Sequence, residues 1–254
     1  MNTTIAFFGG SIPAGVGFAE EKQSKFIYPN LIANNKFEVV NCSKTGSGNY
    51  EIFLSCCNFL ANDYSDIIVI EWNTFHRFWF YPKFDYSLFI SAPGFTVSEK
   101  LESSLELSHS DLKKFQKYLL LLSNDYKKIL ELLDYCIILQ DYAKVKNVKI
   151  VMMNGNTPWT QNIFQNPENI KNIFLESDDF TKNVLDIENL DDEEILHWWS
   201  KIYQKYKKIN LNSWVCFSES LLSSKIDLLP DGHPGPLSHE IYAEKILSHI
   251  KEKL

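Results

Sequence analysis

Short apolar runs alternate with longer segments of helical periodicity along the 254-residue chain. Four runs rich in β-branched or aromatic residues are predicted to be strands, at 4–8, 37–41, 66–72 and 148–153. The runs at 66–72 and 148–153 are almost continuously apolar, as expected of central strands that helices cover on both faces. Helices are predicted at 21–34, 49–62, 110–146 and 238–253.

Strands that alternate with helices are typical of parallel βαβ units, so the pattern predicts an α/β fold. We expect a three-layer α/β/α sandwich around a central parallel sheet. Two stretches exceed the minimal unit, at about 74–108, which is rich in aromatic residues, and at 156–211. We interpret the chain as a single domain, 1–254, with these stretches as insertions after the third and fourth strands. There they would wall the ligand crevice at the carboxyl ends of the strands.

Composition narrows the classes of partner. The formal net charge of -7 disfavours nucleic acid, because an acidic protein repels a phosphate backbone. The 5 cysteines include no CxxC pair, which favours reduced thiols over disulfides or a zinc site. The first residues lack the basic start of a secretory signal, and no run approaches the roughly 18 apolar residues of a membrane helix. We therefore expect a cytoplasmic protein with no membrane partner.

A serine follows the first predicted strand directly. Ser11 has Gly9 and Gly10 before it and Gly15 and Gly17 after it, so a tight turn can expose its hydroxyl at the edge of the sheet. The spacing is neither a phosphate-binding loop nor a dinucleotide fingerprint. The alternative is an ordinary strand-to-helix turn in which Ser11 caps the helix.

A second polar loop precedes the last predicted helix. Asp231 stands two residues before His233 in a segment with three prolines and two glycines, 229–239. That spacing can set a carboxylate against Nδ1 of the imidazole and leave Nε2 to act as a general base, which a serine nucleophile needs. The alternative is that Asp231 caps the following helix.

These features occur in an order that resembles a known family. Ser11, Gly46 after the second strand, Asn73 after the third, and Asp231 with His233 before the last helix resemble the four blocks of the SGNH (GDSL-type) hydrolase superfamily. The resemblance spans nearly the whole chain and implies a flavodoxin-like α/β/α fold. It also implies that Ser11 is the nucleophile and that Asp231 holds His233 as the base. The backbone N–H groups of Ser11 and Gly46 and the side-chain amide of Asn73 would then form the oxyanion hole.

The sequence departs from the family pattern in three blocks. The first reads Gly-Gly-Ser at 9–11 where the family has Gly-Asp-Ser, although the nucleophile is kept. The third reads Glu-Trp-Asn-Thr at 71–74 and lacks both the glycine and the second acid of Gly-x-Asn-Asp. In the last block one residue separates Asp231 from His233, where many members have two; His239 is interpreted as a helix-start residue and not as the base.

Other polar residues near these blocks are candidates for substrate contact. Trp72, His76 and Arg77 flank Asn73 and are predicted to hold a hydroxyl-rich or anionic substrate, Arg77 through its planar guanidinium; an ordinary surface pair is the alternative for the last two. Trp198 and Trp199 suit either stacking on sugar rings or core packing. Glu194 and His197 share a helical face, but a di-iron site needs a second such pair. No metal and no cofactor are predicted.

The resemblance implies a serine esterase that works through an acyl-enzyme on Ser11. An acidic protein with aromatic insertions suggests a small polar ester, such as an O-acetylated sugar or glycan, as its small-molecule partner. Two alternatives stay open: an O-acyltransferase that passes the same acyl group to a sugar, and a non-catalytic glycan-binding domain on the same fold. The oligomeric state is open as well.

Overall fold

The computed structural model describes residues 3–18, 25–73, 125–155, 192–215, 220–221 and 226–253. Its contacts divide the chain into two compact units. The first unit takes in Met1–Thr74, Tyr135–Thr160 and Asn210–Leu254, and the second takes in Phe75–Asp134 and Gln161–Ile209. Most of the two predicted insertions lies outside the described residues, and the single-domain interpretation stays a prediction.

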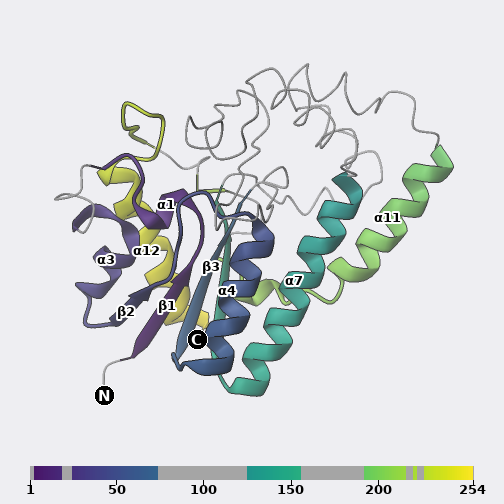
Figure 1. Cartoon of the computed structure of the whole chain (residues 1–254), viewed down its shortest axis with the longest axis horizontal. Helices are drawn as coiled ribbons and strands as arrows, with labels where there is room; N and C mark the ends of the chain where they lie inside the picture. The colour runs from purple at the N-terminus through teal and green to yellow at the C-terminus, as the bar shows by residue number, and fades with distance from the viewer. Residues whose placement is uncertain are drawn as a thin grey trace, which may run out of the picture. The chain divides into compact units, whose positions relative to one another are not determined.

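The first unit holds a four-stranded parallel sheet with the order β2-β1-β3-β4 (Figure 1). The strands are β1 Thr4–Phe8, β2 Glu38–Asn41, β3 Ile67–Trp72 and β4 Lys149–Asn154. Every bound lies within one residue of the prediction, and the strand order confirms the α/β/α flavodoxin-like class. β2 lies on one side of β1, and β3 and β4 lie on the other, so the strand order reverses direction at β1. A crevice is expected at such a point, between the carboxyl ends of β1 and β3.

The burial of each strand matches its position in the sheet. Every residue of β3 is buried, as its continuous apolar run predicts for a central strand, whereas β2 at the edge is mostly exposed. Beyond β4, Trp214 and Ser220 make isolated parallel bridges to Met152 and Asn154. These two residues therefore extend the sheet on the side of β4 that faces away from β3.

Six helices and one 3-10 turn accompany the strands in the described segments. They are α1 Ser11–Ala14, α3 Tyr28–Ala33, α4 Asn49–Asn62, α7 Asp125–Lys146, α11 Asp192–Tyr206, η2 Leu211–Ser213 and α12 Pro236–Lys253. The prediction for α4 is confirmed at both ends, and α12 begins two residues earlier than predicted. The predicted helix at 110–146 is described only from residue 125. None of the helices in these segments is long and apolar enough to cross a bilayer.

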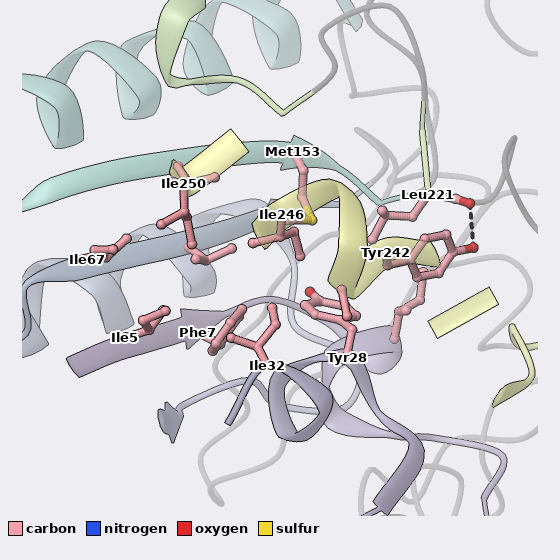
Figure 2. Close-up of a cluster of buried hydrophobic side chains, with 14 residues drawn as sticks. Ile5, Phe7, Tyr28, Ile32, Ile67, Met153, Leu221, Tyr242, Ile246 and Ile250 are labelled. Carbon is pink, nitrogen blue, oxygen red and sulfur yellow. Dashed lines mark hydrogen bonds between the residues drawn. The ribbon is translucent and has the colours of Figure 1, made fainter. Parts of the chain in front are cut away.

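The helices of the first unit cover the two faces of the sheet. On one face α3 and α12 pack over a cluster of side chains from β1, β3 and β4 (Figure 2). In that cluster the Tyr242 hydroxyl donates a hydrogen bond of 2.5 Å to the Leu221 carbonyl. On the other face α4 contacts β1 and β3, and its Phe53 stacks on Tyr135 of α7 at 4.6 Å. Within the second unit, Lys205 of α11 pairs with Asp134.

Candidate active site

Ser11 lies at the carboxyl end of the central strand β1. It is the first residue of α1, whose N-cap is Gly10 and has no side-chain capping hydrogen bond. The alternative that Ser11 caps the helix is therefore wrong. α1 itself was not predicted; it ends at once because Gly15 takes the left-handed conformation, with φ 79°. The Ser11 side chain is buried, with 8% exposure, at the edge of the sheet formed by the carboxyl ends of the strands.

Asn73 occupies the place beside Gly10 that a side chain would otherwise fill. A Cβ built on Gly10 would come within 2.3 Å of Asn73 Nδ2 and 2.9 Å of its Oδ1. Only a glycine at position 10 permits this approach, which sets the amide next to the residue that precedes Ser11. The glycine at position 10 thus has a structural reason in this chain.

Hydrogen bonds fix the orientation of Asn73. Its Nδ2 donates to the Ser47 carbonyl at 2.7 Å, one residue after Gly46. The Asn49 side chain accepts from the Asn73 backbone N–H at 2.8 Å and donates to its carbonyl at 3.1 Å. The loops after β2 and β3 are thereby joined, and Gly46, with φ 79°, lies in the first of them.

The loop after β2 also joins the turn that carries Ser11. The Lys44 backbone N–H donates to the Gly9 carbonyl at 3.1 Å, and Asn41 Nδ2 donates to the Pro13 carbonyl at 2.8 Å. The structure therefore brings the predicted first, second and third blocks together at one edge of the sheet.

Asp231 and His233 face each other in the loop before α12. The Asp231 carboxylate accepts the His233 backbone N–H at 3.1 Å, and its other oxygen lies 3.1 Å from His233 Nδ1. The second contact has the distance of an ion pair but lacks the angle of a hydrogen bond. The Asp231 carboxylate thus lies beside the Nδ1 edge of the imidazole, and its role in orienting His233 as a base stays a prediction.

Asp231 does not cap α12, so that alternative is wrong. The cap is Asp227, whose carboxylate accepts the backbone N–H groups of Leu237 and Ser238 and the Ser238 hydroxyl. Burial raises the pKa of Asp227, but hydrogen bonds from Ser238 and Leu237 outweigh this effect and hold the pKa below its ordinary value. Sequence reasoning missed Asp227, because ten or more residues separate it from the groups that it binds.

The Ser11 turn packs against the loop that holds the Asp231–His233 pair. A Cβ on Gly17 would lie 2.7 Å from Asp231 Oδ2 and 2.8 Å from its Oδ1. Gly17 also has φ 93°, which a side chain disfavours. Within the described part of the chain no hydrogen bond joins Ser11 Oγ to His233, so the catalytic contact between them stays a prediction.

His239 is a buried member of α12. Its Nδ1 accepts the Tyr28 backbone N–H at 3.1 Å, and its ring contacts Phe18, Tyr28 and Tyr242. Burial lowers the pKa of His239 to about 4, so the ring is neutral at physiological pH. This arrangement suits the interpretation of His239 as a structural residue near the helix start.

The three residues predicted to contact substrate stay predictions. Trp72 is buried in β3 at 1% exposure, and a role for it in substrate binding stays a prediction. His76 and Arg77 lie outside the described residues. Among the described residues no cluster of three or more metal-ligating side chains occurs. Cys42, Cys56, Cys57 and Cys136 are free thiols, and burial raises the pKa of Cys56 and Cys136.

No family model and no curated protein matches the chain. Solved structures do. TesA is similar over 99% of this chain and 100% of its own, with 13% identity and a TM-score of 0.47. A putative lipolytic protein of the G-D-S-L family from Desulfitobacterium hafniense DCB-2 is similar over 98% of this chain and 99% of its own, with 10% identity and a TM-score of 0.46. The acetyl xylan esterase AlAXEase is similar over 97% of this chain and 99% of its own, with 14% identity and a TM-score of 0.44. The chain is thus similar, over nearly its whole length, to solved structures that include a G-D-S-L family protein and an esterase.

Proposed function

We propose that the protein is a serine esterase of the SGNH type, with Ser11 as nucleophile, His233 as general base and Asp231 as the group that orients the base. The observation that carries the proposal is the contact between Gly17 and the Asp231 carboxylate. It packs the turn that follows Ser11 onto the loop that bears His233, although more than 200 residues separate them in the sequence.

In the proposed reaction, Ser11 Oγ attacks the ester carbonyl carbon while His233 Nε2 takes the hydroxyl proton. His233 then gives this proton to the departing alcohol oxygen, which leaves an acyl group on Ser11. Water attacks the acyl-enzyme with the same base, releases the acid and restores Ser11. Asp231, beside Nδ1, stabilises the imidazolium that forms in both steps.

The oxyanion would be held by the N–H groups of Ser11 and Gly46 and by the Asn73 amide. The support for Asn73 is its placement against Gly10 and its bond to Ser47, which together restrain the amide before substrate arrives. Preorganised donors of this kind are effective because they need no reorientation as charge develops.

The proposed substrates are small polar esters, with O-acetylated sugars or glycans first. The support comes from the sequence: the aromatic stretch after β3 and the tryptophans after β4 offer flat apolar surfaces that suit sugar rings. A long-chain lipid ester would instead call for an extended apolar channel.

The test is mass spectrometry of the intact protein after reaction with a fluorophosphonate. We expect rapid addition of one adduct that maps to Ser11 and that is lost in Ser11→Ala and His233→Ala. Ser43→Ala is the matched control, because Ser43 lies in the neighbouring loop and has no part in the proposal; it should label like the wild type. A folded wild-type protein that forms no adduct would refute the esterase and favour the glycan-binding domain.

Substrate class is then tested with acetyl esters and long-chain esters of the same alcohol. Release of acetate from acetylated sugars without added acceptor supports hydrolysis. Acetate loss that requires an acceptor sugar would indicate acyl transfer, and activity on long-chain esters alone would overturn the proposed substrate class.

A further inference from the structure

Glu71 is a fully buried carboxylate near the carboxyl end of β3, two residues before Asn73. Side chains alternate along a strand, so Glu71 faces the same side of the sheet as Val69, the side that α3 and α12 cover. Charged side chains are almost never fully buried unless they are paired. A carboxylate at this edge, where the family pattern has a glycine, therefore requires a specific reason.

Glycines that directly follow both neighbouring strands make room for Glu71. A Cβ on Gly155, after β4, would lie 2.7 Å from Glu71 Oε1, and a Cβ on Gly9, after β1, would lie 3.0 Å from Glu71 Cβ. The same Cβ on Gly9 would lie 2.6 Å from Cγ of Pro13 in α1. Gly9 therefore lies close to both Glu71 and Pro13 of the helix that begins with Ser11.

Tyr28 holds the Glu71 carboxylate from above the sheet. Its hydroxyl donates to Glu71 Oε2 at 3.1 Å, and its ring lies among the buried side chains between β1 and α12 (Figure 2). Burial and the nearby carboxylate raise the pKa of Tyr28 well above its ordinary value. The phenol is therefore protonated at physiological pH and donates to Glu71.

The backbone of Tyr28 contacts α12, the helix that follows the His233 loop. Its backbone N–H donates to His239 Nδ1 at 3.1 Å, and the two rings stack at 5.8 Å. The His239 backbone N–H donates to the Gly235 carbonyl, two residues after His233. Tyr28 thus contacts both Glu71, which packs near the Ser11 turn, and His239 in the first turn of α12, the helix that follows the His233 loop.

We propose that Glu71 and Tyr28 are positioning residues that hold the Ser11 turn and the His233 loop at their working separation, an inference that rests on the proposed function. Neither residue touches the reacting atoms; they act through Gly9, Pro13 and His239. The rate of the chemical step is sensitive to such support, since a displacement of the reacting groups by about 1 Å can lower that rate about 10²-fold.

The test compares two tyrosines of the same buried cluster. Tyr28→Phe removes the hydroxyl that binds Glu71, whereas Tyr242→Phe removes the hydroxyl that binds the Leu221 carbonyl. We expect Tyr28→Phe to slow fluorophosphonate labelling of Ser11 and to lower kcat for an acetyl ester by about tenfold, with KM unchanged. Tyr242→Phe should lower the melting temperature about as much as Tyr28→Phe does, but it should leave labelling at the wild-type rate.

Glu71→Gln completes a double-mutant cycle. The amide oxygen can still accept from Tyr28, so this variant should label faster than Tyr28→Phe. The double variant should label no more slowly than Tyr28→Phe alone, because without the Tyr28 hydroxyl no bond is left for the change at position 71 to weaken.

Three results would overturn the inference: wild-type labelling in Tyr28→Phe, equal slowing by Tyr242→Phe, or effects of Tyr28→Phe and Glu71→Gln that multiply. A Tyr28→Phe protein that does not fold would also overturn it, since the hydroxyl would then serve the fold. Failure of the wild type to label at Ser11 refutes the proposed function instead, so the two failures are distinguishable.

Discussion

Gly17 and Asp231 lie so close together that no side chain fits between them. The loop after Ser11 and the loop before α12 meet at this point, and a Cβ on Gly17 would lie within 2.8 Å of both carboxylate oxygens. The lack of a side chain at position 17 is therefore a condition for the approach of the two loops, in addition to the positive φ that glycine allows there.

Gly17→Ala should destabilise the protein more than Gly232→Ala. Both glycines have positive φ, 93° and 85°, but a Cβ on Gly232 would meet no atom within 4 Å. Backbone strain should cost each variant about 1–2 kcal/mol of unfolding free energy. The clash with Asp231 should add about 1 kcal/mol or more to Gly17→Ala. Urea unfolding measures both; equal losses would show that the Asp231 loop moves aside without cost.

Asn73→Ala should lower activity more than Asn49→Ala does, although each variant loses buried hydrogen bonds. Asn73→Ala removes the amide proposed for the oxyanion hole and should lower kcat by about 10²–10³-fold. Asn49→Ala removes two bonds to the Asn73 backbone and should lower the unfolding free energy by about 1–3 kcal/mol. Ester hydrolysis and denaturant unfolding are measured for both variants. An Asn73→Ala protein with wild-type kcat would remove this residue from the oxyanion hole.

The strands could be predicted because burial imposes a simple pattern on them. β3 reads Ile-Ile-Val-Ile before Glu71, and such a short run of β-branched apolar residues is typical of a strand that is covered on both faces. The candidate site was accessible from the sequence for a different reason: the order of Ser11, Asn73 and the Asp231–His233 pair along the chain resembles the SGNH blocks. Parallel topology places Ser11 and Asn73 at the carboxyl ends of neighbouring strands.

The features that escaped prediction depend on contacts between distant residues. The capping role of Asp227 needs α12 folded against it, and the fit of Asn73 beside Gly10 needs β1 and β3 paired. The burial of Glu71 was equally hidden, because nothing local shows that Gly9 and Gly155 will flank it. Each is a packing relationship that exists only in the folded chain.

Two aspartates of one loop should give opposite phenotypes. Asp227→Ala removes the cap of α12 and should lower the unfolding free energy by about 1–2 kcal/mol. Asp231→Ala should change stability less, because this side chain is 43% exposed, and should instead slow labelling of Ser11. Melting temperature and labelling rate are compared in the same samples. If Asp231→Ala labelled at the wild-type rate, Asp231 would have no role in orienting His233.

The pKa of Asp227, which lies below its ordinary value, determines when the cap is lost in acid. A carboxylate with a lowered folded-state pKa stabilises the protein at neutral pH, and this contribution disappears as pH falls below about 4. Asp227→Ala should therefore differ most from the wild type near pH 7. The difference should shrink at pH 3, where the wild-type carboxyl is becoming protonated; a constant difference would mean that the negative charge of Asp227 does not stabilise α12.

His239 should make the protein less stable in mild acid. Burial lowers its pKa to about 4, so the unfolded chain takes up a proton below pH about 6.5 that the folded protein refuses. The stabilisation is complete at pH 7 and is lost as pH falls toward 4, by about 3 kcal/mol at most. His239→Asn keeps an acceptor near the position of Nδ1 but does not titrate. Unfolding free energies measured between pH 7 and 4.5 should therefore fall more steeply in the wild type than in His239→Asn. Carboxyl groups elsewhere titrate alike in both proteins, so parallel pH profiles would mean that His239 accepts a proton without unfolding.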